Sequence, residues 1–334
     1  MTDALPLDIP SRGRITEGPT TSLVEQTLVF VFSELASWRD DPDRPPEDAE
    51  ERLNAQLCKY LNVAASDRFP MASVFKLPVA LTLLGGKTPP PLSLKIKLDA
   101  SAIRTFQSPI AERAPRGGIT LTVAELLDAM LIASDNTAAD ILLEMCGGPA
   151  GVTAHLRALG IDGIRVDRSE GQMALDYAGV TAVLPESQWS LDWFKRVMAA
   201  VPRDQQHAAT ERFLTGERDT ATPESILALL RLLAEGKAVP KGPTELVLDR
   251  MRRTIPGAAR IKAGLPAGTR VAHRPGSGGN NEGITLCTND VGIVELPGGD
   301  RMLVAIFLKG SNQDTAAQER TIAEITRAIY SAWE

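Results

Sequence analysis

The stretch Phe69-Pro70-Met71-Ala72-Ser73-Val74-Phe75-Lys76 places the pattern S-x-x-K at the opening of an apolar helix. Residues three apart share one helix face, so the amine of Lys76 can approach the hydroxyl of Ser73. A serine becomes a nucleophile when a base takes its proton, and a lysine can be that base if its pKa is lowered. A helix start also presents free N–H groups to a reacting centre. The pattern therefore predicts a serine nucleophile, although S-x-x-K alone is common.

Three more polar runs follow in the chain. Ser134-Asp135-Asn136 lies between two predicted helices, where Asp135 is expected to shape a tight turn. Asp167-Arg168-Ser169-Glu170 comes next, and Arg274-Pro275-Gly276-Ser277-Gly278 follows a β-prone segment near the C-terminus. Together with Ser73 and Lys76, these runs provide the hydroxyls, amide, carboxylate and positive charge of a hydrolytic site.

The order and spacing of these runs resemble those of class A serine β-lactamases. The patterns S-x-x-K, S-D-N and K-T-G together are the signature of these enzymes and of penicillin-binding proteins. The resemblance extends from Phe69 to the C-terminus and includes two further stretches, Gly216–Pro223 and Thr288–Gly292. It implies an acyl-serine hydrolase of β-lactams that uses no metal and no cofactor.

The resemblance also implies a role for each matching residue. Ser73 would attack the β-lactam carbonyl, and Lys76 would take its proton directly unless Glu170 takes it through a water. Ser134 would pass a proton to the departing ring nitrogen. Asn136 would hold Lys76 and bind the side-chain amide of the substrate. Glu170, in an Ω-loop, would activate the water that frees Ser73.

The third motif is implied to bind the substrate. The backbone N–H groups of Ser73 and Ser277 would form the oxyanion hole, and Gly276 belongs to the same substrate-binding strand. Arg274 would supply positive charge near the substrate carboxylate. Pro275 departs from the family, because a threonine or serine usually stands there and its hydroxyl contacts the carboxylate. Ser277 or a separate arginine is expected to replace that contact.

Two more departures concern the Ω-loop. Ala174 stands where the family usually has an asparagine that helps to hold the deacylating water, so hydrolysis of the acyl-enzyme is expected to slow. An insertion near residues 183–213 carries several aromatic side chains. It either reshapes the substrate cleft or adds a helix that packs on the surface. Arg168 is expected to pin the loop through an ion pair with Asp219 or Asp176.

Local signals predict an α+β fold. Thr122 and Glu125 form a capping box, and Thr222-Pro223-Glu224 marks another helix start. Residues 292–296 and 302–308 flank a Pro-Gly-Gly-Asp turn, which predicts a hairpin, and Thr315–Trp333 has helical spacing. These elements predict the serine β-lactamase/penicillin-binding fold, an antiparallel sheet flanked by helices with an inserted all-helical domain.

The expected domain organisation follows from this fold. Residues 1–20 form a loose N-terminal arm, 21–72 and 256–334 an α/β domain, and 73–255 the mostly helical domain. Gln26–Leu35 is expected to be a helix or a strand, and Ala55–Asn62 a strand. Met1–Thr20 lacks the basic start and apolar core of a secretory signal, whereas the resemblance implies a periplasmic or secreted monomer.

Composition excludes several other classes. The chain has 334 residues, 43% apolar and 23% charged, as in globular proteins. A net charge of −6 argues against a nucleic-acid partner, and no apolar run is long enough to span a membrane. The three cysteines are far apart and only three histidines occur, so the chain offers few ligands for a zinc site. Reduced thiols are favoured over a disulfide.

Two alternatives to a β-lactam hydrolase stay open. One is a penicillin-binding or sensor-like protein that is acylated and turns over slowly, which Ala174 and Pro275 favour. The other is a related serine hydrolase of other esters or amides. Glu170 argues against a peptidase, because those relatives lack the carboxylate that activates water.

Overall fold

The computed structural model describes residues 28–36, 66–99, 103, 107–114, 118–181, 183–281, 283–297 and 299–333. At its centre lies an antiparallel sheet whose strands follow the order β1-β9-β8-β6, with β7 paired to β8 as well. The bounds of these strands are Leu28–Ala36 for β1, Val271–Ser277 for β6, Asn280–Asn281 for β7, Ile284–Glu295 for β8 and Arg301–Ser311 for β9. The part of the 26–35 segment that is described is therefore a strand.

Strands β8 and β9 form the hairpin that the sequence predicts, and they pair from Thr285↔Ser311 to Glu295↔Arg301. Successive side chains of a strand point to opposite faces, so a strand buried on both faces is mostly apolar, although β8 also buries the polar run Thr288–Asp290. Both strands are almost wholly buried. One face of β9 packs on helix α13 (Thr315–Trp333) through Met302, Val304, Ile306 and Leu308. The other face joins the core shared with the helices through Leu303, Ala305 and Phe307.

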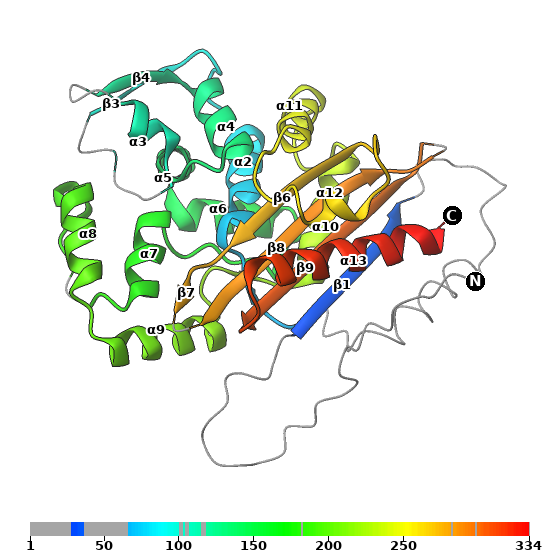
Figure 1. Ribbon diagram of the computed structural model, residues 1–334. Coiled ribbons are helices and arrows are strands. Elements are labelled where there is room, and N and C mark those ends of the chain that lie inside the picture. The colour runs from blue at the N-terminus through cyan, green and yellow to red at the C-terminus, as the bar shows by residue number, and fades with distance from the viewer. Residues whose placement is uncertain are drawn as a thin grey trace.

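The helices beyond the sheet pack around α2 (Lys76–Gly85), of which nine residues are buried. Figure 1 shows α2 among the helices on one face of the sheet, with α13 across the front of the sheet on its opposite face. The bounds of the remaining helices are Pro109–Arg113 (α3), Val123–Ile132 (α4), Asn136–Met145 (α5), Gly148–Ala158 (α6), Glu170–Ala178 (α7), Leu191–Ala199 (α8), Arg203–Thr215 (α9), Pro223–Ala234 (α10), Lys241–Arg252 (α11) and Ile261–Gly264 (α12). Two single-turn 3₁₀ helices are Ala72–Phe75 (η1) and Glu186–Gln188 (η3).

The predicted helix starts are confirmed. The Thr122 hydroxyl accepts the N–H of Glu125, whose carboxylate accepts the N–H of Thr122 in return, so α4 begins with a capping box. Helix α10 begins at Pro223, and the side chain of Thr222 before it accepts the N–H of Ser225. Such caps satisfy N–H groups that the helix leaves open, and each stabilises its helix by about 1 kcal/mol.

Two short sheets complete the frame. Strands β3 (Lys95–Leu98) and β4 (Ile119–Thr122) pair ahead of α4. Strand β2 (Phe69–Pro70) pairs with β5 (Thr220–Ala221), directly before η1. This pairing ties the start of the S-x-x-K run to the loop after α9 and so fixes the chain directly before the serine-bearing turn.

The segment near residues 183–213 folds into η3, α8 and α9. Trp189, Trp193 and Phe194 form one aromatic cluster with ring centroids 5.3–5.8 Å apart. This cluster packs on Leu175 and Val180 at the end of α7. Helix α8 thus supports the outer side of α7, which agrees with the packing interpretation of the insertion.

Some predictions lie outside the described residues, namely the 1–20 arm, Ala55–Asn62 and Cys58. The division into residues 21–72, 73–255 and 256–334 stays a prediction. Cys146 and Cys287 are free thiols. Among the described residues, no helix is long and apolar enough to cross a membrane, and no cluster of three or more His, Cys, Asp or Glu could hold a metal ion.

Candidate active site

Ser73 and Lys76 meet at the junction of η1 and α2. The amine of Lys76 donates to Ser73 Oγ at 2.9 Å, as the i, i+3 spacing predicts. Ser73 is half-buried, so its hydroxyl is reachable, whereas Lys76 is fully buried. Burial lowers the pKa of Lys76, and the nearby Arg274 acts in the same direction while Glu170 opposes it. Burial and a nearby positive charge are the two influences that make a lysine a usable base, and both act on Lys76.

The loop between α4 and α5 brings two more predicted residues to the same amine. Lys76 Nζ donates to Asn136 Oδ1 at 2.5 Å and lies 3.2 Å from Ser134 Oγ. Ser134 has φ of +60°, a left-handed conformation that costs a non-glycine residue free energy. Asp135 stabilises this turn, because its buried carboxylate accepts the N–H groups of Ala138 and Ile110. Its predicted turn-shaping role is confirmed.

Glu170 reaches the site from the first position of α7. Its Oε1 lies 2.8 Å from Lys76 Nζ and 3.5 Å from Ser73 Oγ, which donates to it. Asp140 on α5 holds the backbone of this helix start, accepting the N–H of Glu170 at 2.7 Å and that of Gly171 at 3.2 Å. The structure thus brings Ser73, Ser134, Asn136 and Glu170 together around the side-chain nitrogen of Lys76.

The third motif lies on β6, beside η1. A Cβ on Gly276 would collide with the carbonyl oxygen of Met71, so only glycine allows this close approach of strand and turn. Gly278 N–H donates to Cys287 O, and Glu295 N–H to Arg270 O. In an antiparallel pair, every second residue of a strand forms backbone hydrogen bonds with the partner strand. Arg270 and Gly278 bond to β8, so Pro275 and Ser277 are among the residues whose backbone N–H and C=O positions face the outer edge of β6. Proline therefore costs the sheet no hydrogen bond.

Arg274 is fully buried next to Ser134. Its guanidinium donates to Ser134 Oγ, to the Ser73 carbonyl at 3.0 Å and to the Leu131 carbonyl at 2.8 Å. Burial lowers its pKa to about 10. Arg274 therefore contacts the site from behind Ser134 and donates to protein acceptors.

A second arginine, which sequence analysis missed, lies at the front of the same strand. Arg260 donates to Ser277 Oγ at 2.6 Å and to the carbonyls of Gly276 and Asn289 at 3.0 and 2.8 Å. Its Nε pairs with Glu319 at 3.2 Å. The sequence allowed Ser277 or a separate arginine to compensate for Pro275, and Arg260 contacts Ser277 directly.

A comparison with models of protein families identifies the family of this chain. The model described as "Beta-lactamase enzyme family" matches residues 54–333, which is most of the chain. The chain belongs to this family. Together with the class A enzymes among its relatives, this confirms the predicted class A serine β-lactamase and its fold.

Individual relatives agree with this assignment. Beta-lactamase VEB-1 of Pseudomonas aeruginosa is 29% identical over 284 residues, which cover 84% of this chain and 83% of that protein. A solved β-lactamase from Chitinophaga pinensis is 27% identical with a TM-score of 0.68, covering 86% of this chain and 100% of that one. A solved ancestral class A β-lactamase (GNCA) is 32% identical with a TM-score of 0.62, covering 80% and 86%.

Ala174 of this class A β-lactamase packs against the aromatic cluster of α8. Its methyl group thus contacts the support of α7 and supplies no ligand for a water near Glu170. Arg168 pairs with each of the two alternative partners that the sequence offered, Asp219 at 2.5 Å and Asp176 at 2.8 Å. The ion pairs and the cluster hold the segment around Glu170 from two sides.

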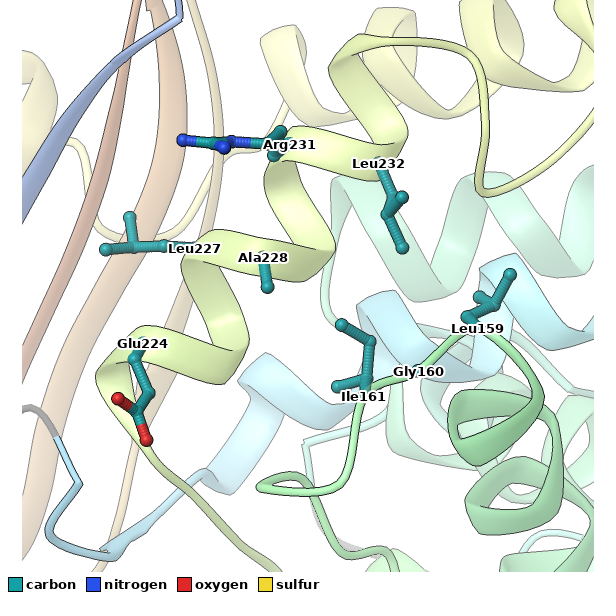
Figure 2. Close-up of a pocket in the computed structure, with 8 residues that line it drawn as sticks. All are labelled: Leu159, Gly160, Ile161, Glu224, Leu227, Ala228, Arg231 and Leu232. Atoms are coloured by element: carbon teal, nitrogen blue, oxygen red, sulfur yellow. The ribbon is translucent and has the colours of Figure 1, made fainter.

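A separate cavity of about 410 Å³ lies away from these residues, between the turn after α6 and α10. Figure 2 shows Ile161 facing this space, while the guanidinium of Arg231 points toward the sheet. None of the predicted site residues lines it. Its walls are mostly aliphatic, with Glu224 and Arg231 as the charged residues.

The pKa of Asp140 gives a testable pH dependence. Burial, reinforced by Glu170, raises it to about 7 from its usual value of 3.8. The folded protein then binds more protons than the unfolded chain between these values, so the free energy of unfolding falls as pH rises from about 4 to 7. We expect wild type to lose about 2–3 kcal/mol more stability than Asp140→Asn between pH 5 and 8. Thermal unfolding across this range measures the difference, and parallel curves would contradict the raised pKa.

Proposed function

We propose that this β-lactamase hydrolyses the cyclic amide of β-lactams through an acyl-enzyme on Ser73. One observation carries the proposal. The buried amine of Lys76 lies 2.9 Å from Ser73 Oγ and 2.8 Å from Glu170 Oε1, so it connects a nucleophile with a carboxylate that can act on water. Ser73 is only partly buried, so a substrate carbonyl can approach its hydroxyl.

Acylation begins when Ser73 Oγ attacks the lactam carbonyl and Lys76 takes its proton. Lys76 is the favoured base because its amine is closer to Ser73 Oγ than the Glu170 carboxylate, which lies at 3.5 Å. Its lowered pKa also increases the fraction of Lys76 that is in the neutral amine form. The oxyanion is stabilised by the N–H groups of Ser73 and Ser277, and the outward-facing backbone of Ser277 supports this role.

Ser134 completes acylation as the lactam C–N bond breaks. Its hydroxyl donates a proton to the departing nitrogen and is reprotonated by Lys76, which lies 3.2 Å away. The guanidinium of Arg274 donates to the same Ser134 oxygen and stabilises the negative charge that develops there during transfer. Arg274 thus acts through Ser134.

Deacylation is assigned to Glu170. Its carboxylate takes a proton from a water, which attacks the ester carbonyl, and Ser73 leaves with a proton returned to its oxygen. Asn136 accepts a hydrogen bond from Lys76 and so orients it. Its substrate-binding role, to the side-chain amide, is part of the proposal. Arg260 and Ser277 supply the positive charge and hydroxyl that suit the carboxylate of a β-lactam.

The test is intact-protein mass spectrometry during hydrolysis of a chromogenic cephalosporin. Sustained colour with little adduct at steady state is the expected result, and Ser73→Ala should abolish both colour and adduct. Persistent turnover in that variant would overturn the nucleophile assignment. Absence of colour and adduct in the wild type would overturn the proposed substrate class.

Ala174 supports a second candidate function, an acylating protein of slow turnover, because the position that would hold the deacylating water carries only a methyl group. The same measurement separates the two functions. A single burst of colour with a stable adduct favours slow turnover, whereas continuous colour favours the hydrolase.

A further inference from the structure

A cavity of about 640 Å³ lies outside the Ser73 cluster, between the end of α7 and the end of α9. Figure 1 shows these two helices next to each other at one end of the molecule. The turn after α7 and the loop after α9 complete its walls, and the side chain of Arg168 lines it as well. Its volume falls within the range of about 300–1,000 Å³ that is common for small-molecule sites.

The charges around this cavity leave one positive charge without a counterpart. Arg168, Arg212 and Arg218 line it together with one carboxylate, that of Asp176. One oxygen of Asp176 accepts from both Arg168, at 2.8 Å, and Arg218, at 3.2 Å. Asp219 pairs with Arg168 as well, which makes two carboxylates for three guanidinium groups. The Arg212 side chain has no ion pair among the residues that the structure describes.

The other walls are apolar. Val180, Val183 and Phe213 line the cavity, and Val183 is 45% exposed although it is aliphatic. The Phe213 ring lies 4.3 Å from the guanidinium carbon of Arg168, so one face of the ring is already engaged by a cation. Arginines beside aliphatic and aromatic surface match a ligand that carries one negative charge on an apolar body.

We propose that this cavity binds a small organic carboxylate with an apolar body. The carboxylate lies between Arg212 and Arg218, and the body covers Val183 and the part of Phe213 that lines the cavity. Inorganic anions would leave the apolar walls exposed, and a neutral ligand would leave the positive charge without a counterpart. No residue of the Ser73 cluster lines the cavity, although Arg168 and Asp176, which line it, also hold the segment around Glu170.

Isothermal titration of the whole protein with 4-phenylbutyrate tests the proposal, with 4-phenylbutanamide as the neutral match. We expect one equivalent of the acid to bind and the amide to bind about tenfold more weakly. Replacing Arg212 by Gln should weaken the acid about fivefold, because it removes the unpaired charge. Arg203→Gln is the matched control, since Arg203 is an exposed arginine on the same helix that does not line the cavity.

Asp176→Asn provides a test in the opposite direction. It removes the carboxylate that competes for Arg168 and Arg218, so 4-phenylbutyrate should bind about fivefold more tightly. Equal affinity for acid and amide, equal effects of the Arg212 and Arg203 variants, weaker binding by Asp176→Asn, or no binding would each overturn the proposal. The titration contains no β-lactam, so its outcome is separate from the test of hydrolysis.

Discussion

Replacing Glu170 by Gln should convert the protein from a catalyst into one that accumulates an acyl-enzyme. The substitution keeps the size of the side chain, but an amide cannot take a proton from water, so deacylation should slow by about 10²–10⁴-fold. Acylation should persist, because Lys76 still lies 2.9 Å from Ser73 Oγ. Mass spectrometry after mixing with a penicillin should show the protein plus one substrate mass, stable for minutes or longer.

Glu224→Gln is the matched control for this variant. Both glutamates lie in the first turn of a helix, where the positive end of the helix dipole favours their charge. Glu224 is exposed and remote from Ser73, so its variant should turn over like the wild type. Failure of Glu170→Gln to form any adduct would instead make Glu170 the base of acylation, and unchanged turnover would remove it from deacylation.

Replacing Lys76 by Gln should nearly abolish acylation. The variant removes the only amine that the structure places next to Ser73 Oγ within the described residues, and a base in this position contributes about 10²–10⁴-fold to the rate. Neither colour nor adduct should accumulate on the timescale of the wild type. Stopped-flow measurement of the first turnover reports this step directly.

Removal of Lys76 also disturbs a buried ion pair, because Glu170 loses its cation at 2.8 Å. Thermal unfolding must therefore accompany the kinetics, with Lys87→Gln as an exposed control of the same chemistry. A folded Lys76→Gln variant that acylates at the wild-type rate would show that another group takes the proton of Ser73.

Local sequence signals predicted much of the fold. Capping at Thr122 and Thr222 depends on residues one helical turn apart, so the local pattern is sufficient. The β8–β9 hairpin likewise follows from alternation around one turn. The pairing of β1 with β9 joins residues such as Leu28 and Lys309, almost the whole chain apart, and no local pattern encodes such a contact.

The site was predictable to the extent that its residues lie in recognisable motifs. Ser73, Lys76, Ser134, Asn136 and Glu170 lie together as the motif spacing led us to expect. Their chemical roles stay predictions until they are measured.

Other parts of the site depend on tertiary packing. Arg274 was expected near a substrate carboxylate, and in the structure it is fully buried and donates to protein acceptors. The sequence shows the charge of this side chain but not its burial. Arg260 was missed because it belongs to no motif and reaches Ser277 only through the fold. Asp140 had a usable signal, since it stands four residues after Asn136 and therefore shares its helix face.

The outward-facing proline of β6 has a further consequence for how the protein meets other chains. Within the described strands β6 forms an edge of the main sheet, and a free edge can template the addition of a foreign strand. Pro275 has no N–H to offer at that edge, and Ser277 is the next residue that turns its N–H outward. A peptide or a second copy that tried to extend the sheet would find its hydrogen-bond ladder interrupted. The missing N–H therefore disfavours the pairing of an extended chain along β6, whose residues 271–276 are also buried.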